Sequence, residues 1–373
     1  MKKIGILGGG QLGRMLLQAA INYPVQTFIL ENDDHCPAAH LCHHFTKGDI
    51  RDFDAVYNFG KNLDAITIEI ENVNVEALEK LEAEGVQIFP RPSVLRIIKN
   101  KILQKQYYNK QEIPTAAFVI TQNKMILREY VDFLPAVHKL AEGGYDGRGV
   151  VLLSNGTDME TGFDEPAVLE KMVAVEKEIS IIVAVNEKGQ MALYPPVEMV
   201  FDKDLNQLDS QICPAGVNEK TLWKLEAFAR TVVKNFKSPG IFAVELFVDR
   251  QGEVFVNETA PRVHNSGHHT IEAHFSSQFD MLWRIMLGYP LGNTAPILPS
   301  IMINVIGAQE FSGPAIYEGI EEVLKMDHVF VHLYGKAETR PGRKMGHLTI
   351  LSRDRVDLVH QVNKLKRMMI VKS

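Results

Sequence analysis

The N-terminal segment of the chain most strongly restricts its fold. A short apolar strand, Ile4–Leu7, runs directly into a Gly-x-Gly-x-x-Gly loop at residues 8–13, and helical apolar spacing follows over Gln11–Ala20. Glycines permit this tight turn from strand to helix, and the free N–H groups at the helix start favour an anion. Glu31, at the end of the next strand, completes a dinucleotide-binding pattern, but the loop equally suits another phosphorylated ligand or packing alone. The segment therefore predicts a doubly wound parallel sheet, with its ligand left open.

The alternation of strands and helices ends near residue 92, and the pattern changes from about residue 115. Further elements of the N-terminal part are expected at Gln26–Leu30, Asp52–Gly60, Asp64–Glu69, Asn74–Glu84 and Gln87–Phe89. A polar helical stretch, Ser93–Gln111, then leads into strands joined by tight glycine turns, with helices at Glu219–Phe236 and Gln278–Leu287. These strands are expected at Ala117–Ile120, Leu134–Lys139, Val150–Leu153, Val168–Lys171, Ile179–Val185, Met191–Tyr194, Gly240–Asp249 and Glu253–Thr259.

A third unit is expected at the C-terminus. Strands at Ile301–Val305, Val329–Tyr334 and His347–Leu351 precede a terminal helix, Val356–Met369. We therefore predict an α/β and α+β chain in three domains. They are an N-terminal parallel-sheet domain at 1–92, a central domain at 93–295 with a subdomain at about 115–170, and a small β-rich domain at 296–373.

The composition excludes several classes of protein. The chain has 373 residues, of which 46% are hydrophobic and 23% charged, and its net charge is −6. This balance excludes disorder and gives no general attraction to nucleic acid or to an anionic membrane. No apolar run approaches the roughly 18–20 residues of a membrane-spanning helix. The three cysteines fit a reducing compartment better than a disulfide scaffold, so we expect a cytoplasmic location.

A second glycine-rich segment indicates a phosphate site. Residues 143–149 contain four glycines in seven residues and lie between two expected strands. Successive backbone N–H groups of such a segment can converge on oxyanions, and Arg148 adds a positive charge. Lys139, at the end of the preceding strand, is well placed for a phosphate. We interpret the segment as a flap that covers phosphates, the alternative being an exposed loop with incidental charges.

Two glutamates indicate a metal site. A four-residue loop at Arg250–Glu253 would place Glu245 opposite Glu258 across a hairpin, although a shorter loop would shift the pairing. Adjacent carboxylates in apolar strands repel each other unless a cation lies between them, and oxygen ligands favour Mg²⁺. Asn257 adds a neutral oxygen. Two surface glutamates on exposed strand faces remain the alternative.

Two further polar segments indicate ligand binding. Residues 259–269 form a non-periodic run that is rich in hydrogen-bond donors, and four basic residues gather around a Pro-Gly turn near residue 341. These four residues are Lys336, Arg340, Arg343 and Lys344. They suit a second phosphate group, or they form a solvated basic turn. The His and Cys residues between 35 and 44 lack the short Cys pairs of zinc sites, so we do not expect zinc there.

Five ordered motifs carry a resemblance to a known family. They are Gly8-Gly9-Gly10-Gln11-Leu12-Gly13-Arg14-Met15, Glu69-Ile70-Glu71-Asn72-Val73, the flap at 143–149, Asn257-Glu258 with Pro261 to His268, and Arg340 to His347. Together they resemble the 5-(carboxyamino)imidazole ribonucleotide synthases, ATP-grasp enzymes of purine biosynthesis, over essentially the whole chain. The resemblance implies an ATP-grasp fold and a C–N ligase that uses ATP and Mg²⁺, with a homodimer as the expected assembly.

The resemblance also implies a reaction. ATP, bicarbonate and 5-aminoimidazole ribonucleotide would give the N-carboxylated ribonucleotide, ADP and phosphate, with carboxyphosphate as the intermediate. Asp146 resembles the proton acceptor of this reaction, and the residues expected around the reacting groups are Tyr145, Arg148, His264 and Lys336. Mg²⁺ would be held by Glu245 and Glu258.

Binding residues are implied in the same way. ATP would contact Lys101, Lys139, the flap residues Gly144, Tyr145, Asp146, Gly147, Arg148 and Gly149, the adenine-side residues Glu170, Lys171 and Val173, the ribose carboxylate Glu178, and Asn257 with Glu258. The ribonucleotide would contact Gln11, Leu12, Glu71, Arg262, His264, Asn265, Lys336, Arg343 and Lys344. Lys101, Ala141, Glu142 and Phe201 depart from the residues that are frequent in the family.

Two other functions are compatible with parts of the sequence. A nicotinamide-dependent oxidoreductase would explain the first glycine loop and Glu31, but it leaves the flap, the glutamate pair and the basic cluster unexplained. A nucleotide-binding regulatory protein would require a damaged catalytic set, whereas Asp146, Lys336 and both carboxylates are present. Neither reading involves nucleic acid or a membrane.

Overall fold

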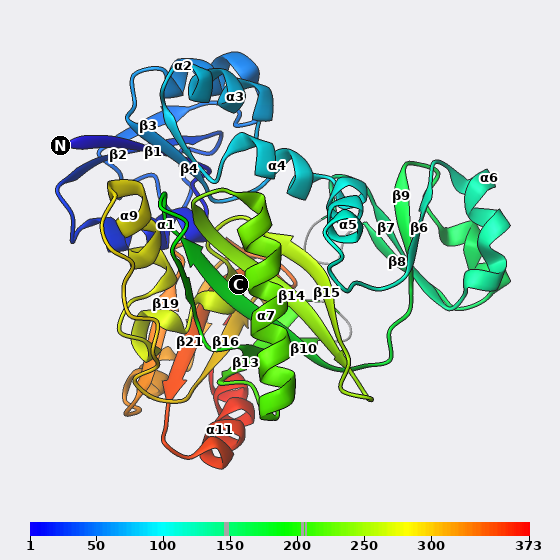
Figure 1. The fold of residues 1–373 in the computed structure, drawn as a ribbon. Helices are drawn as coiled ribbons and strands as arrows, with labels where there is room; N and C mark the ends of the chain where they lie inside the picture. Colours follow the sequence, from blue (N-terminus) through cyan, green and yellow to red (C-terminus); the bar gives the residue numbers. More distant parts are fainter. Residues whose placement is uncertain (145–148, 203–204, 206) are drawn as a thin grey trace.

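The N-terminal part contains the expected parallel sheet. The computed structural model describes residues 1–373 apart from 145–148, 203–204 and 206 (Figure 1). Five strands pair in the order β3-β2-β1-β4-β5, and every pairing is parallel. The strands are β1 (Lys2–Leu7), β2 (Val25–Glu31), β3 (His44–Lys47), β4 (Ala65–Ile68) and β5 (Gln87–Phe89). The sequence did not indicate β3, because this edge strand is largely exposed and has no apolar run.

The helices of this part begin at recognisable capping residues. The side chain of Asp52 accepts a hydrogen bond from Ala55 N, and that of Asn74 accepts one from Ala77 N. One expected element is wrong, since the helical stretch Ser93–Gln111 is two helices. The chain breaks at Asn100, whose side chain caps the second helix. The helices are α1 (Gln11–Ala20), α2 (Phe53–Gly60), α3 (Val75–Ala83), α4 (Pro92–Lys99) and α5 (Lys101–Lys110).

A small antiparallel sheet projects from the molecule beyond α5 (Figure 1). Its strands pair in the order β6-β9-β7-β8, and the glycine-rich segment 143–149 connects β7 to β8. One face is covered by α6 (Lys124–Leu127) and two 3₁₀ turns at Arg128–Phe133 and Gly156–Thr161. The strands are β6 (Phe118–Thr121), β7 (Ala136–Leu140), β8 (Val150–Leu153) and β9 (Ala167–Lys171).

A nine-stranded sheet forms the centre of the molecule and continues into the C-terminal part. Its path is β15-β14-β10-β12-β13-β16-β21-β19, and β11 pairs with β10. The strands are β10 (Val175–Val185), β11 (Met191–Leu193), β12 (Val197–Asp202), β13 (Gln207–Cys213), β14 (Gly240–Asp249), β15 (Val254–Ala260), β16 (Ser300–Ile306), β19 (Val329–Leu333) and β21 (Lys344–Leu351). The sequence did not indicate β12 and β13, although β13 joins the two parts by pairing with β16.

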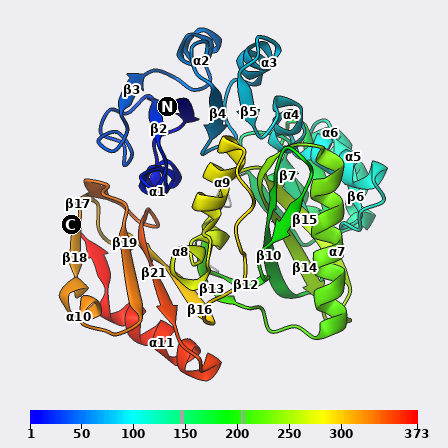
Figure 2. The same cartoon turned by 60° about the vertical axis from the view of Figure 1, so that its left-hand side comes forward.

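Two long helices cover opposite faces of this sheet (Figure 2). Their bounds, α7 (Glu219–Phe236) and α9 (Gln278–Leu287), agree with the expectation from the sequence. Ile181 and Val183 of β10 pack with α7, whereas Ile182 packs with α9 and the N-terminal core. The indole N–H of Trp283 donates to the carbonyl of Leu16 at 2.7 Å and so connects α9 to α1.

The last helix covers the C-terminal end of the sheet. Leu358 and Leu365 of α11 (Arg355–Met368) pack against Ile303 and Ile350 of the sheet. The remaining elements are a 3₁₀ turn at Asn265–Gly267, α8 (Thr270–Ala273), β17 (Gly313–Pro314), β18 (Ile316–Glu318), α10 (Ile320–Leu324), β20 (Glu338–Thr339) and β22 (Ile370–Lys372). Among the described residues, no helix has the length and apolar character that crossing a membrane requires.

Candidate active site

One cavity of about 680 Å³ lies where the three parts of the chain meet. Its described lining comes from the first glycine loop, the strand β15 and the loop after it, and the basic turn near residue 341. The expected site residues on its wall are Gln11, Leu12, Glu71, Lys101, Gly144, Glu245, Glu258, Arg262, His264, Asn265, Lys336, Arg343 and Lys344. Residues that are more than 300 positions apart in the sequence thus share one wall: the ammonium group of Lys336 donates to Gln11 Oε1 at 2.8 Å.

Other expected residues do not line this cavity. Among the described residues, this applies to Lys139, Gly149, Glu170, Lys171, Val173, Glu178 and Asn257. Lys139 is nevertheless close to the wall, because its Nζ donates to Asn257 Oδ1 at 2.9 Å and Asn257 precedes Glu258 in β15. Tyr145, Asp146, Gly147 and Arg148 lie outside the described residues, so their expected roles remain predictions.

The glutamate pair is confirmed as cross-strand neighbours, but the expected loop is wrong. Glu245 pairs with Glu258, as a four-residue loop would require. The turn is in fact shorter, since Asp249 N donates to Glu253 O and Val248 pairs with Val254. The register then shifts by one residue between Glu245 and Leu246, which restores the pairing of the glutamates. Both carboxylates reach the same cavity because of this bulge.

The two carboxylates have different electrostatic surroundings. Lys101 Nζ lies 2.6 Å from Glu258 Oε2, and its charge lowers the pKa of Glu258. Burial, and secondarily the charge on Glu258, raises the pKa of Glu245. His264 Nε2 lies 3.7 Å from Glu245 Oε1. A buried carboxylate that resists ionisation beside another carboxylate fits a divalent cation, because that cation would stabilise both charges.

A buried ion-pair network supports Lys139. Glu170 Oε1 lies 3.1 Å from Lys139 Nζ, and its other oxygen lies 2.9 Å from Lys105 Nζ. Lys105 is 3% exposed, and burial lowers its pKa to about 8. Its Nζ also donates to Thr115 Oγ1 at 2.6 Å. No sequence pattern indicated a role for Lys105, because it is one of several polar residues in a helix of weak periodicity.

The first glycine loop binds carboxylates of the chain itself. Glu69 accepts hydrogen bonds from Gly10 N and Gly13 N, both at 2.5 Å, and Glu31 Oε2 accepts one from Gly9 N at 3.1 Å. These N–H groups are the ones that a dinucleotide pyrophosphate would use. The loop therefore has no free anion site of the dinucleotide type in this structure. Glu69 belongs to one of the five family motifs, but nothing in the sequence alone indicated this contact.

The basic residues of the cavity wall are held by hydrogen bonds and ion pairs. Lys336 Nζ also donates to the carbonyl of Lys344 at 2.6 Å, and Arg343 donates to the carbonyl of Glu338 at 2.8 Å. Arg262 Nε forms an ion pair with Glu71 Oε1 at 3.0 Å. An anionic group of a ligand would therefore find side chains that are already oriented.

Family models identify the class of protein that this fold and cavity define. A model of the ATP-grasp domain matches residues 106–279, and a model of the ribonucleotide synthetase preATP-grasp domain matches residues 1–99. A model of the phosphoribosylaminoimidazole carboxylase C-terminal domain matches residues 300–361. The chain thus has the ATP-grasp fold with an N-terminal parallel-sheet domain and a C-terminal domain.

Individual relatives specify the family. The chain is 36% identical to N5-carboxyaminoimidazole ribonucleotide synthase of Brucella melitensis, over 93% of this chain and 95% of that protein. It is 37% identical to the chloroplastic phosphoribosylaminoimidazole carboxylase of Vigna aconitifolia, over 93% of this chain, and it spans only 64% of that longer relative. The chain belongs to the N5-carboxyaminoimidazole ribonucleotide synthase family.

Solved structures agree with this assignment. The synthetase from Thermotoga maritima superposes with a TM-score of 0.91 and 36% identity, with each chain covered completely. The synthase from Aspergillus clavatus, solved in complex with ADP and 5-aminoimidazole ribonucleotide, superposes with a TM-score of 0.89 and 31% identity over 98% of both chains. The expected family and fold are confirmed, and the dinucleotide-dependent oxidoreductase is not supported.

Proposed function

We propose that the chain joins bicarbonate to 5-aminoimidazole ribonucleotide at the expense of ATP, giving 5-(carboxyamino)imidazole ribonucleotide, ADP and phosphate. The observation that carries this proposal is one cavity whose wall includes both the carboxylates Glu245 and Glu258 and the cations Lys336, Arg343 and Lys344. The carboxylates suit a nucleotide phosphate with its cation, and the basic side chains suit the phosphate of a ribonucleotide. One cavity can therefore hold both substrates at once.

The chemistry requires this arrangement. Bicarbonate does not react with a weak amine, so one of its oxygens must first become a leaving group. It takes the terminal phosphoryl group of ATP, which yields carboxyphosphate and ADP. The amine then attacks the carboxyl carbon, phosphate leaves with the electrons of the C–O bond, and the amine loses a proton. Asp146 remains our predicted acceptor of that proton.

The described residues have positioning roles in this reaction. Glu245 and Glu258 would hold Mg²⁺, which supplies charge stabilisation at the transferred phosphoryl group. Lys101 pairs with Glu258 and Lys139 contacts the neighbouring Asn257, so both cations suit the nucleotide phosphates. Gly143 and Gly144 lie on the wall at the start of the flap. We propose that the flap covers carboxyphosphate and excludes water, which would hydrolyse it.

The remaining assignments extend the same proposal. The division into domains at 1–92, 93–295 and 296–373, the roles of the individual site residues, the homodimer and the cytoplasmic location all follow from the resemblance and the composition. The ionic and hydrogen-bonding groups of the cavity suit small anionic substrates. We propose no nucleic-acid or membrane partner.

Phosphate release tests the proposed function. The purified chain should release phosphate from MgATP only when both bicarbonate and 5-aminoimidazole ribonucleotide are present, with one carboxylated ribonucleotide formed per phosphate. Omission of either substrate is the control, because it separates the synthase from a simple ATPase. Phosphate release that is indifferent to the ribonucleotide, or the absence of carboxylated product, would contradict the proposal.

A further inference from the structure

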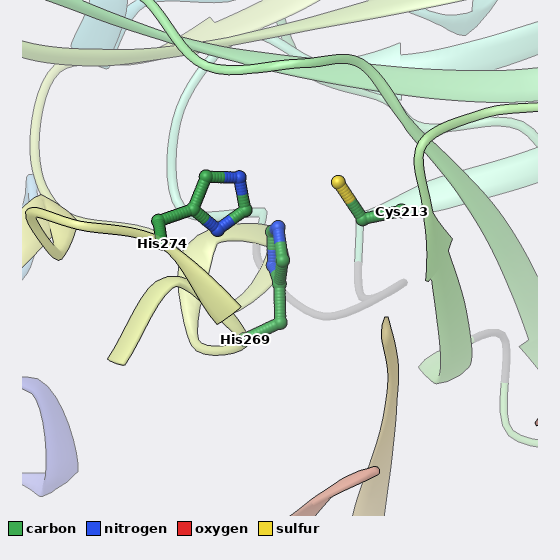
Figure 3. A group of neighbouring side chains, drawn as sticks. All are labelled: Cys213, His269 and His274. Atoms are coloured by element: carbon green, nitrogen blue, oxygen red, sulfur yellow. The ribbon is translucent and has the colours of Figure 1, made fainter. Parts of the chain in front are cut away.

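A buried cluster of one cysteine and two histidines lies outside the catalytic cavity (Figure 3). Cys213, His269 and His274 each offer one ligand atom, and these atoms all lie within 4.8 Å of one another. The three residues are 2%, 1% and 3% exposed. Figure 3 shows the sulfur atom and the two rings turned toward a common space. In the described part of the chain, no other group of His, Cys, Asp or Glu residues meets the same spacing.

The ring nitrogens of this cluster lack ordinary partners. Within the described residues, His274 has no hydrogen-bond partner on either nitrogen, and His269 has none on Nε2. The other nitrogen of His269, Nδ1, lies 3.0 Å from the side-chain nitrogen Nε2 of Gln211. Buried polar groups in proteins are nearly always paired, so unpaired nitrogens beside a buried thiol call for an explanation. One cation would use a nitrogen of each ring and the sulfur together.

The backbone holds the three side chains in place. Cys213 ends β13, where it pairs with Ser300 of β16. His269 and His274 flank α8, and the residues after His274 pair with the segment that leads to β16. The ring of Tyr194 lies edge-on to His274 at a centroid distance of 5.5 Å. A ligand would therefore bind to a largely preformed site.

We propose that Cys213, His269 and His274 bind a structural Zn²⁺ ion. Thiolate and imidazole ligands favour Zn²⁺ over Mg²⁺, and Zn–N and Zn–S bonds of about 2.0–2.3 Å require the ligand atoms to move closer together by roughly 1 Å. On binding, the thiol of Cys213 loses its proton to solvent, and the ion replaces it with no change in oxidation state. A water molecule would complete the four-coordinate shell.

The proposed zinc site connects the central sheet to the loop that forms part of the cavity wall. Cys213 belongs to the strand that joins the central sheet to β16, whereas His269 follows directly on the loop with His264 and Asn265 of the cavity wall. Zn²⁺ would fix this loop against the sheet. It does so independently of the carboxylate pair, whose oxygen ligands suit Mg²⁺.

Cobalt provides the decisive spectroscopic test. Metal-free protein is titrated with Co²⁺ in excess Mg²⁺, which occupies the carboxylate pair. We expect one tightly bound Co²⁺ per chain with a thiolate-to-cobalt charge-transfer band, and its loss when Zn²⁺ displaces Co²⁺. The double variant Cys36→Ser/Cys42→Ser leaves Cys213 as the only thiol of a chain with three cysteines and should keep the band. Absence of the band in the wild-type chain or in this variant would overturn the proposal.

Removal of single ligands supplies the second test. Cys213→Ser and His274→Gln should each weaken Zn²⁺ binding by more than about 100-fold, since even outer-shell partners contribute 10- to 100-fold. Zn²⁺ should raise the melting temperature of the wild-type chain and of Cys36→Ser but not of Cys213→Ser. Equal stabilisation of Cys213→Ser by Zn²⁺ would show that the ion binds elsewhere. If Cys213→Ser does not fold, the double variant alone decides.

Discussion

Some functional residues in and near the cavity could be predicted from the sequence, and others could not. Glu245 and Glu258 were found because a carboxylate pair in an apolar hairpin is a chemical anomaly that can be seen in the sequence. Lys105 and Glu69 escaped because their roles depend on partners 65 and 59 positions away, Glu170 and Gly10. A single buried charge leaves no periodic signal. Such residues become visible only when the folded chain brings their partners together.

Glu258→Gln should abolish turnover. The substitution keeps the size of the side chain but removes the charge that binds the cation, so we expect phosphate release to fall by at least about 100-fold. The variant should still fold, although Lys101 loses its carboxylate partner. Glu253→Gln is the matched control, because Glu253 lies at the exposed end of the same hairpin and pairs with Lys224. Near wild-type phosphate release by Glu258→Gln at ordinary Mg²⁺ concentrations would remove Glu258 from the metal site.

The network of Lys105, Glu170 and Lys139 predicts an order of stabilities. Glu170→Gln leaves two buried ammonium groups without a carboxylate and should lower the free energy of unfolding by about 3–5 kcal/mol. Lys105→Met still leaves Glu170 paired with Lys139, so it should lower the free energy of unfolding clearly less than Glu170→Gln does. Urea unfolding of both variants gives the comparison, and Lys110→Met, at an exposed position of the same helix, is the control. Equal losses of unfolding free energy for Glu170→Gln and Lys105→Met would contradict the prediction that Glu170 holds both lysines.

At the level of elements, prediction succeeded where the signal was local. The bounds of α1, α7 and α9 agree with the sequence because each helix has a clear apolar face, and α7 and α9 begin at a capping Asn218 or Ser277. The strand β13 was missed because polar residues such as Gln207, Asp209 and Gln211 interrupt it. The strand β12 was missed although four of its six residues are apolar. Their stability comes from neighbours in the sheet, and this long-range pairing is not encoded in a short window.

The small sheet carries a pH-dependent contribution to stability. His138 in β7 is buried, with its Nε2 2.9 Å from Thr121 Oγ1, and burial lowers its pKa from 6.5 to about 4. Between these values the unfolded chain binds more protons than the folded chain. Stability should therefore fall as the pH drops from about 6.5 to about 4, by about 2 kcal/mol after allowance for solvent screening.

Comparison with a variant isolates this contribution. The difference in unfolding free energy between the wild-type chain and His138→Gln should shrink as the pH is lowered from 6.5 toward 4.5, because only the wild-type chain loses the His138 contribution. His360→Gln, at an exposed position of α11, should run parallel to the wild-type chain. A constant difference between His138→Gln and the wild-type chain over this range would contradict the assignment.

For the whole molecule, the continuous nine-stranded sheet predicts that the C-terminal part unfolds together with the centre. Met302 of β16 is fully buried and packs with Val197 and Leu208 of the central strands. Met302→Ala should lower the free energy of unfolding by about 2–5 kcal/mol. The fluorescence of Trp283, which is buried in a different core, should report the same loss of stability. The reason is that both cores share the continuous sheet and should unfold together.

Tryptophan fluorescence during urea unfolding measures this coupling. The midpoint reported by Trp283 should shift with Met302→Ala, whereas Ile297→Ala, at a half-exposed position just before β16, should leave it nearly unchanged. Trp223, the other tryptophan of the chain, is replaced by Phe in all variants so that the signal is unambiguous. An unchanged midpoint for Met302→Ala would mean that the C-terminal strands unfold on their own.

The strand β10 has a consequence for how this chain tolerates changes in length. Its alternate side chains belong to two separate hydrophobic clusters: Ile181 and Val183 pack toward α7, and Ile182 and Ala184 toward α9 and the N-terminal sheet. Substitution of one apolar residue by another changes one cluster only. A one-residue insertion or deletion within Val175–Val185 would exchange the two sets and misalign both clusters at once. We therefore expect length changes to be tolerated only in the turns at the ends of this strand.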